Sequence, residues 1–186
     1  RRLSLIQGPP GTGKTHTAVH LLSAFVNLGR GPVLATAESN VAVDNLLEGL
    51  LELGVKAVRI GRPVKVREHL RQATLDAQIE HHPMQEELRF IREQNDELRR
   101  SLKGLKGKDK GMAHREVNRN FKEIRSLEGS MISAVLDGAE VICATTIGVG
   151  HKLLKDRRFP VVLMDEATQA SEPSALGPIT RGCRQL

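Results

Sequence analysis

The amino-acid sequence predicts an α/β fold in which helices flank a parallel β-sheet. Short apolar runs of strand length alternate along the chain with segments whose apolar residues recur at helical spacing. This alternation is typical of βαβ units, whose crossover helices bring successive strands into parallel alignment. The alternation is interrupted once, over residues 61–129, where no strand pattern occurs. We therefore expect one sheet domain, residues 1–60 and 130–186, that carries a helical insertion at residues 61–129.

The predicted elements of the sheet domain follow one another in a regular order. Before the insertion we expect a strand at Leu3 to Gln7, a helix from Lys14 to the glycines at 29 and 31, a strand at Val33 to Ala37, a helix at Val41 to Leu53 and a strand at Val55 to Ile60. After the insertion, apolar runs at 140–145 and 161–164 predict two more strands. A further strand is expected to begin at Cys183, so we expect the 186 residues to be part of a longer protein.

The insertion is predicted to form an antiparallel helical hairpin with a basic tip. Two narrow apolar stripes at helical spacing indicate its helices, one from Leu88 to Leu105 and one from Val117 to Val135. The connector between them, Gly104 to Gly111, is rich in Gly and Lys. Residues 99–110 hold six basic residues and one acidic residue, a net charge of +5. Two interpretations of this tip remain open, a solvated lysine turn and a projection that contacts phosphate groups.

Composition limits the possible partners. The formal net charge of +6 favours anionic partners such as nucleotides or nucleic acid. The chain has no Trp or Tyr and four Phe, which disfavours recognition of bases by stacked aromatic side chains and favours contact with the nucleic-acid backbone. No apolar run approaches the roughly 18 residues of a membrane span, so we expect an intracellular protein, cytoplasmic or nuclear, without a membrane partner. The two cysteines, Cys143 and Cys183, are expected to be buried or inert thiols.

The segment GPPGTGKT matches the G-x-x-x-x-G-K-[ST] pattern of a phosphate-binding loop and stands between a predicted strand and a predicted helix. Its glycines allow the backbone to turn so that N–H groups face phosphate oxygens at the positive end of the helix. The two prolines stiffen the loop, Lys14 neutralises phosphate charge, and Thr15 offers a hydroxyl to Mg²⁺. The predicted ATP-binding residues are Gly8, Pro9, Pro10, Gly11, Thr12, Gly13, Lys14 and Thr15.

The segment VVLMDEATQ, residues 161–169, supplies two carboxylates at the end of a predicted strand. In a doubly wound sheet this carboxyl edge is where ligands bind. We expect Asp165 to hold Mg²⁺, directly or through water, and Glu166 to polarise the water that attacks the γ-phosphate. Many strands end in acids, but together with the phosphate loop this pair predicts the hydrolysis of ATP.

Four segments match motifs of one known family. They are QGPPGTGKT, SNVAVDNL at residues 39–46, CATTIG at 143–148 and DEATQASEP at 165–173. Together they resemble the first RecA-like domain of superfamily 1 helicases, in the up-frameshift branch that includes the immunoglobulin mu-binding protein 2 and senataxin groups. The resemblance extends from Leu3 to Leu186 and includes the helical insertion. It implies a P-loop NTPase fold and an ATP-driven helicase or translocase that acts on single-stranded RNA or DNA with a second RecA-like domain.

The resemblance also implies roles for individual residues. Gln169 would sense the γ-phosphate, and the catalytic residues would be Lys14, Glu166 and Gln169, with Thr15 and Asp165 holding the metal. The residues that match motifs contacting the nucleic-acid backbone are Ser39, Asn40, Thr145 and Thr146. Taken alone, Ser39 is equally suited to cap the helix that follows, and the threonine pair to end a strand.

Two features depart from the family's pattern. Glu38 stands where the family commonly has Pro, so an acid lies beside a segment expected to contact phosphate. The motifs that usually follow Leu186, the arginines of the second domain and an upstream adenine-contacting glutamine are not among the 186 residues. Because an arginine finger contributes roughly 10³ to 10⁵ in rate, this segment alone is expected to hydrolyse ATP slowly. Two alternatives therefore remain: an interaction module that binds without turnover, and a P-loop kinase, against which DEATQ and the SN motif argue.

Overall fold

The computed structural model describes residues 3–62 and 65–186 of the chain. The chain divides into two compact units, residues 1–77 with 136–186, and residues 78–135. The limits of the second unit differ from the insertion expected at 61–129 because residues that follow the third predicted strand fold with the sheet. A short 3-10 helix, η2 (Glu68–Ala73), lies there, and Thr74 forms a parallel bridge with Arg59.

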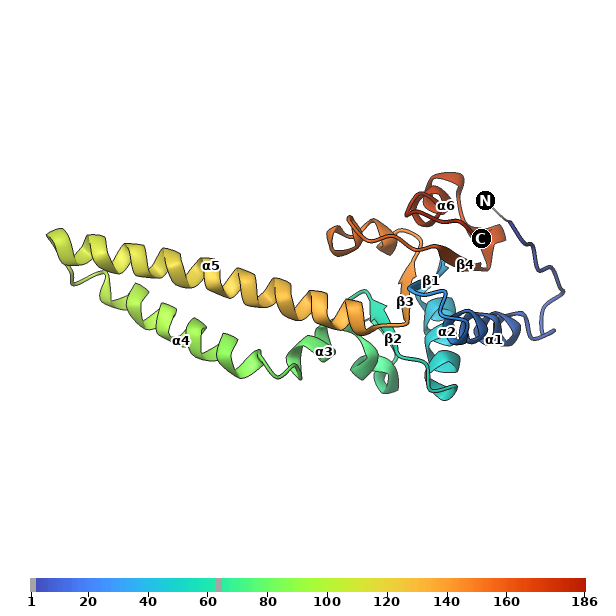
Figure 1. Cartoon of the computed structure of the whole chain (residues 1–186), viewed down its shortest axis with the longest axis horizontal. Coiled ribbons are helices and arrows are strands. Elements are labelled where there is room, and N and C mark those ends of the chain that lie inside the picture. The colour runs from blue at the N-terminus through green and yellow to red at the C-terminus, as the bar shows by residue number, and fades with distance from the viewer. Residues whose placement is uncertain (1–2, 63–64) are drawn as a thin grey trace. The chain divides into compact units, whose positions relative to one another are not determined.

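The first unit is built on a four-stranded parallel sheet with the strand order β2-β3-β1-β4 (Figure 1). Its strands are β1 (Val33–Ala37), β2 (Ala57–Ile60), β3 (Val141–Thr145) and β4 (Val161–Asp165). These four predicted strands are confirmed, each within two residues of the expected limits. Ala37 is in register with Thr145 on one side and with Asp165 on the other. The carboxyl ends of three strands therefore meet at one edge of the sheet.

Two helices, α1 (Lys14–Asn27) and α2 (Asn40–Glu52), pack against each other and against one face of this sheet, and they overlap in the view of Figure 1. Both occupy the predicted segments, since their apolar residues recur at helical spacing. Their buried side chains share one hydrophobic core with alternate residues of the four strands. This core includes Leu22 of α1, Leu47 of α2 and the strand residues Ala35, Ala57, Cys143 and Val161. Alternate strand residues share one face of a sheet, so this pattern positions α1 and α2 above the same strands.

The strand predicted at Leu3 to Gln7 is wrong. The structure gives these residues no regular secondary structure, and the side chains of Leu3, Leu5 and Ile6 are 65, 84 and 55% exposed. The place beside β4 is taken by Gln185, which forms a parallel bridge with Val161. Ser4 N–H instead donates to the carbonyl oxygen of Leu186 at 2.7 Å. A strand needs a row of backbone partners and a buried face, and within the described residues this segment has neither.

The second unit is an antiparallel pair of helices, α4 (Gln85–Ser101) and α5 (Gly107–Gly138), preceded by α3 (Leu75–Glu80). Arg92 forms an ion pair with Glu128, and the Arg99 guanidinium lies 5.6 Å from the centre of the Phe121 ring, so residues early in one helix face residues late in the other. Apolar residues form a core in this unit: Leu88, Ile91, Ile124 and Met131. The predicted hairpin is confirmed, with a connector at 102–106 that is shorter than expected.

Both cysteine thiols are buried, as predicted. Burial raises the pKa of the Cys143 thiol to about 12, since the charged form is poorly solvated; Arg59 lowers this pKa and Asp44 raises it further. Over residues 3–62 and 65–186, no helix combines the length and the apolar character needed to cross a membrane.

Candidate nucleotide and nucleic-acid site

The predicted site residues gather at the carboxyl edge of the sheet. Ala37, Thr145 and Asp165 end three adjacent strands in register, so the SN, TT and DE motifs all begin at this edge. Ligands of parallel α/β sheets bind outside the carboxyl ends of the strands. The topology therefore brings the SN, TT and DE motifs together at this edge of the sheet. The phosphate loop lies there too, because Thr15 bonds to Asp165.

The phosphate loop enters α1 through glycines in the left-handed region of backbone space. Gly11 and Gly13 have φ values of 77° and 79°, which residues with a Cβ rarely adopt. Gly13 is the N-cap of α1, and no side chain in the described part of the chain caps this helix end. The N–H groups of the first helical turn have no intrahelical acceptor, so they are available to an anion.

Side chains of the phosphate loop close it onto its own carbonyl groups. Lys14 Nζ donates to the carbonyl oxygens of Gly8 and Pro9, both at 2.8 Å. Thr12 Oγ1 donates to the same Pro9 oxygen at 2.8 Å. The ammonium group is thus held at the loop, beside the N-terminus of α1, and a bound phosphate would offer it a charged partner in place of neutral carbonyls.

The two predicted metal ligands meet in the structure although 150 residues separate them. Thr15 Oγ1 donates to Asp165 Oδ2 at 2.9 Å. The other carboxylate oxygen, Asp165 Oδ1, accepts from the backbone N–H of Glu166 at 2.9 Å. Mg²⁺ prefers oxygen ligands and usually binds one or two carboxylates together with substrate phosphates. A hydroxyl and a carboxylate beside the phosphate loop fit a nucleotide with its magnesium ion.

Glu166 is the one non-glycine residue with a positive φ within the described ranges, at φ 51° and ψ 37°. Such backbone strain costs about 1–3 kcal/mol and concentrates at functional sites. The 3-10 helix η5 (Ala167–Gln169) follows, and Gln169 N–H donates to Glu166 O at 2.9 Å. Both side chains are exposed. The two residues are therefore linked in one turn directly after the metal-ligand candidate Asp165.

The SN motif is held within the fold by hydrogen bonds. Ser39 Oγ accepts from Ala42 N–H at 3.1 Å and is the N-cap of α2, the alternative that the sequence left open. Asn40 Oδ1 accepts from Arg59 Nη2 at 2.9 Å. Arg59 is 1% exposed and forms a buried ion pair with Asp44 at 3.2 Å. The nucleic-acid contacts of Ser39 and Asn40 stay predictions.

The two threonines of the TT motif differ in accessibility. Thr145 is half-buried, and its Oγ1 accepts from Gly148 N–H at 3.0 Å. A Cβ at position 148 would lie 2.8 Å from this oxygen, so the turn requires glycine there. Thr146 is 2% exposed, and its Oγ1 donates to Glu38 Oε2 at 2.5 Å. Thr145 is therefore the member of the pair that solvent reaches.

Sequence reasoning missed two charged residues near the site, Asp44 and Arg59, and the hydrogen-bonding role of a third, Glu38. Asp44 and Arg59 form the buried ion pair behind Asn40, and Glu38 accepts the Thr146 hydroxyl hydrogen. Signals for the first two existed, because Arg59 interrupts an apolar strand and Asp44 interrupts the apolar face of a helix. A charge in a buried pattern requires a partner, although the pattern does not identify which residue that is.

A parallel sheet, a phosphate loop that opens a helix, and a strand-end aspartate bonded to the loop threonine define a P-loop NTPase domain of the RecA-like type. The AAA_11 family model, described as an AAA domain, matches residues 1–186, and the chain belongs to this family. The resemblance to the first domain of superfamily 1 helicases is confirmed by the relatives that the chain matches.

Three relatives are 33 to 38% identical to the chain in alignments that cover nearly the whole chain. ATP-dependent helicase NAM7 of Saccharomyces cerevisiae is 38% identical, over 100% of the chain and 18% of that protein. Regulator of nonsense transcripts 1 of Dictyostelium discoideum is 37% identical, over 99% of the chain and 13% of that protein. Uncharacterized ATP-dependent helicase MJ0104 of Methanocaldococcus jannaschii is 33% identical, over 98% of the chain and 33% of that protein. The chain thus spans a third or less of the length of these relatives.

Proposed function

We propose that this chain is the first motor domain of an ATP-dependent helicase or translocase that acts on single-stranded RNA or DNA. The observation that carries the proposal is the 2.9 Å hydrogen bond between Thr15 and Asp165, which joins the phosphate loop to the acidic strand end. Relatives named as ATP-dependent helicases support it. The domain works with a second RecA-like domain that contributes the arginines, inside the cell, in the cytoplasm or the nucleus.

ATP and Mg²⁺ are the cofactors of this function, and ATP supplies the phosphoryl group that is transferred to water. The N–H groups of the loop and Lys14 bind the phosphates, while Thr15 and Asp165 hold the metal ion. Glu166 accepts the proton of the attacking water, a role that the strained backbone at this residue supports. The hydrogen bond between Gln169 and Glu166 supports a role for Gln169 beside it. Catalysis then consists mainly of positioning and charge neutralisation.

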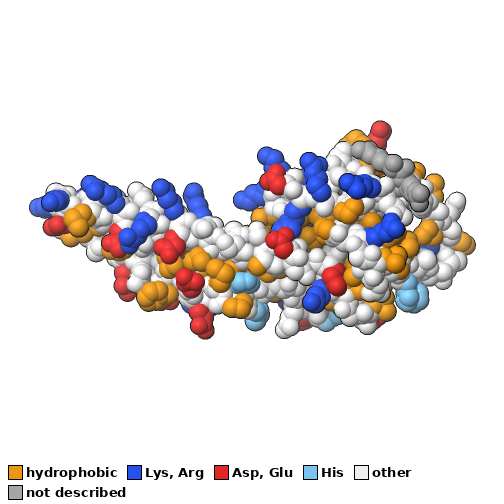
Figure 2. All heavy atoms as spheres, in the orientation of Figure 1, with side chains coloured by type: hydrophobic (Ala, Val, Ile, Leu, Met, Phe, Trp, Pro, Cys, Tyr) orange, Lys and Arg blue, Asp and Glu red, His pale blue; other side chains and the backbone are white. Residues whose placement is uncertain are grey.

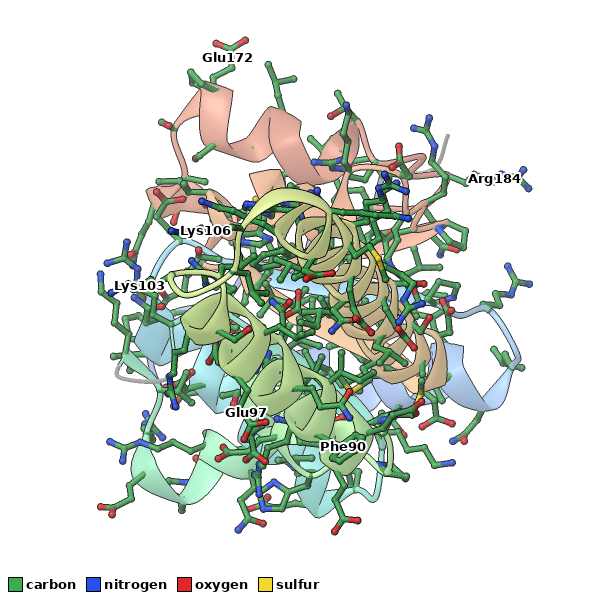
Figure 3. All side chains as sticks on the ribbon, turned by 90° about the vertical axis from the view of Figure 1, so that its left-hand side faces the viewer. Phe90, Glu97, Lys103, Lys106, Glu172 and Arg184 are labelled. Atoms are coloured by element: carbon green, nitrogen blue, oxygen red, sulfur yellow. The ribbon has the colours of Figure 1, made fainter. Side chains whose placement is uncertain are left out.

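Nucleic acid is bound through its backbone at two places in this proposal. One is the sheet edge with the SN motif and Thr145. The other is the basic tip of the helical hairpin, defined here as the exposed residues Lys103, Lys106, Lys108 and Lys110. Figure 2 shows Lys and Arg side chains gathered where α4 and α5 join, and in Figure 3 Lys103 and Lys106 project from the connector. Exposed ammonium groups without a base-reading side chain favour phosphate contacts.

The test is a steady-state ATPase assay of the natural full-length protein with and without single-stranded RNA or DNA. We expect nucleic acid to raise the rate and Lys14→Ala to abolish hydrolysis in both conditions. Lys56→Ala, which removes an exposed lysine before β2, is the matched control and should behave as the parent. Phosphate transfer to a nucleoside or nucleotide would favour a kinase instead, and nucleotide binding without turnover would favour an interaction module.

A further inference from the structure

Hydroxyl groups from two distant segments of the first unit meet at one carboxylate oxygen, Glu38 Oε2. Glu38 directly follows β1. Its Oε2 accepts from Thr146 Oγ1 at 2.5 Å and lies 3.2 Å from Ser174 Oγ. Thr146 directly follows β3, and Ser174 lies in α6 (Glu172–Ile179), which comes after the turn that carries Glu166. One side chain therefore joins the SN segment, the TT turn and the helix behind the hydrolytic residues.

The bond from Thr146 is the stronger of the two. Its hydroxyl is buried, so water does not compete for it, and hydrogen bonds to a charged acceptor are roughly twice as strong as neutral ones. Thr146 N–H also donates to the carbonyl oxygen of Ala37 at 3.0 Å, which fixes the same turn to the end of β1. Without an acceptor at position 38, the Thr146 hydroxyl would be left buried and unpaired.

The bond from Ser174 is weaker and easier to exchange. The Ser174 hydroxyl carries one hydrogen, and the carbonyl oxygen of Ser171 lies 2.9 Å from it, closer than Glu38. The hydrogen is therefore shared between two acceptors. The backbone of α6 also approaches the turn closely, because a Cβ at Gly177 would lie 3.5 Å from the carbonyl oxygen of Thr146. A small displacement of α6 would change the Ser174 contact while leaving the Thr146 bond in place.

We propose that Glu38 is a positioning residue that couples ATP hydrolysis to the binding of nucleic acid. Glu38 precedes Ser39, and its partner Thr146 follows Thr145. The hydrogen bonds of Glu38 therefore hold Ser39 and Thr145 in a fixed relation to α6, and so to the turn at Glu166. Binding of a nucleic-acid backbone at the TT turn is then transmitted to the hydrolytic residues through one carboxylate. This inference rests on the proposed function, because it concerns how its two sites communicate.

The experiment measures the coupling directly in the natural full-length protein. Single-stranded poly-uridine RNA and poly-thymidine DNA serve as probes, and the stimulation ratio is the ATPase rate with polymer divided by the rate without it, at saturating ATP. We expect Glu38→Ala to lower this ratio by about tenfold, within the usual range of coupling between two sites, while the rate without polymer changes by less than about twofold. Glu38→Gln keeps one acceptor oxygen and should fall between the parent and Glu38→Ala.

Two further variants separate coupling from general damage. Glu172→Gln removes an exposed carboxylate from α6, whose side chain points away from the ribbon in Figure 3, and should keep the parent ratio. The double variant of Glu38→Ala with Thr146→Val should have the same ratio as Glu38→Ala, because the second substitution removes a hydrogen bond that the first has already broken. If Glu38→Ala does not fold, as judged by its thermal unfolding, Glu38→Gln and Thr146→Val carry the test.

Several results would overturn the inference. One is an unchanged ratio in the Glu38 variants of a parent protein that the polymers stimulate, which would leave the proposed function intact. Another is an equal loss of the rates with and without polymer, which would assign Glu38 a structural role alone. A parent protein that neither polymer stimulates would refute the proposed function, and the coupling with it.

Discussion

Replacement of the four lysines of the basic tip by glutamine should flatten the salt dependence of nucleic-acid binding. The change removes four positive charges, and all four side chains are exposed on the connector and the first residues of α5. Glutamine keeps most of the length and polarity of lysine, so the fold of the hairpin should be preserved. Its core lies elsewhere, among Leu88, Ile91, Ile124 and Met131.

The magnitude follows from counterion release. For a single strand, the slope of log K against log salt concentration changes by about 0.7 for each phosphate that is neutralised. If each lysine contacts one phosphate, the slope becomes less steep by about 2.8 in the glutamine variant. Between 50 and 200 mM salt, the parent protein should therefore lose about 50-fold more affinity than the variant.

The assay is fluorescence anisotropy of a labelled single-stranded oligonucleotide, titrated with the natural full-length protein at several salt concentrations. A variant with arginine at the same four positions keeps the charges and should keep the parent slope, which controls for effects of substitution alone. Equal slopes for the parent protein and the glutamine variant would refute the argument and leave the basic tip as a solvated turn.

Three further predictions concern single residues. Glu166→Gln should lower the ATPase rate by about 10²- to 10⁴-fold while a fluorescent nucleotide still binds, because only the proton acceptor is lost; a parent-like rate would exclude Glu166 as the base. Asp44→Ala should reduce the free energy of unfolding in urea by about 3–5 kcal/mol, since Arg59 would stay buried without its carboxylate; a loss below about 1 kcal/mol would contradict a structural ion pair. The pKa of Cys143 is raised from 9.0 to about 12 in the folded protein, so its contribution to stability is complete below pH 9 and is lost as the pH rises toward 12. As the pH rises through that interval, ionisation of this thiol in the unfolded chain should lower the free energy of unfolding by up to about 1.4 kcal/mol per pH unit. Urea denaturation of Cys143→Ala at several pH values should show a smaller decrease of the free energy of unfolding with pH.

The parts of the fold that local patterns encode were predicted from the sequence. The strands β1, β3 and β4 are predominantly apolar runs of strand length, which is typical of strands in a parallel sheet. Helices α1 and α2 begin after a glycine and a serine that end the preceding loop. The phosphate loop was identified for the same reason, since its glycine spacing and its place between strand and helix are local properties.

Contacts between distant residues could not be predicted in this way. The partners of Glu38 lie 108 and 136 residues further along the chain, and no pattern around Glu38 indicates them. At Leu3 to Gln7, by contrast, a local pattern predicted a strand that the structure does not form. Its apolar residues suit a strand, but strand formation depends on a neighbouring strand, and Gln185 occupies the position beside β4.

By itself, the sequence predicted a phosphate loop and the strand that ends in two carboxylates, because loop flexibility, charge and periodicity are properties of adjacent residues. Only the tertiary structure showed that Thr146 is buried against Glu38 and that Asn40 is held by Arg59. The physical reason is that a parallel sheet brings strand ends together through crossovers of variable length. Which side chains then share a hydrogen bond depends on strand order and register.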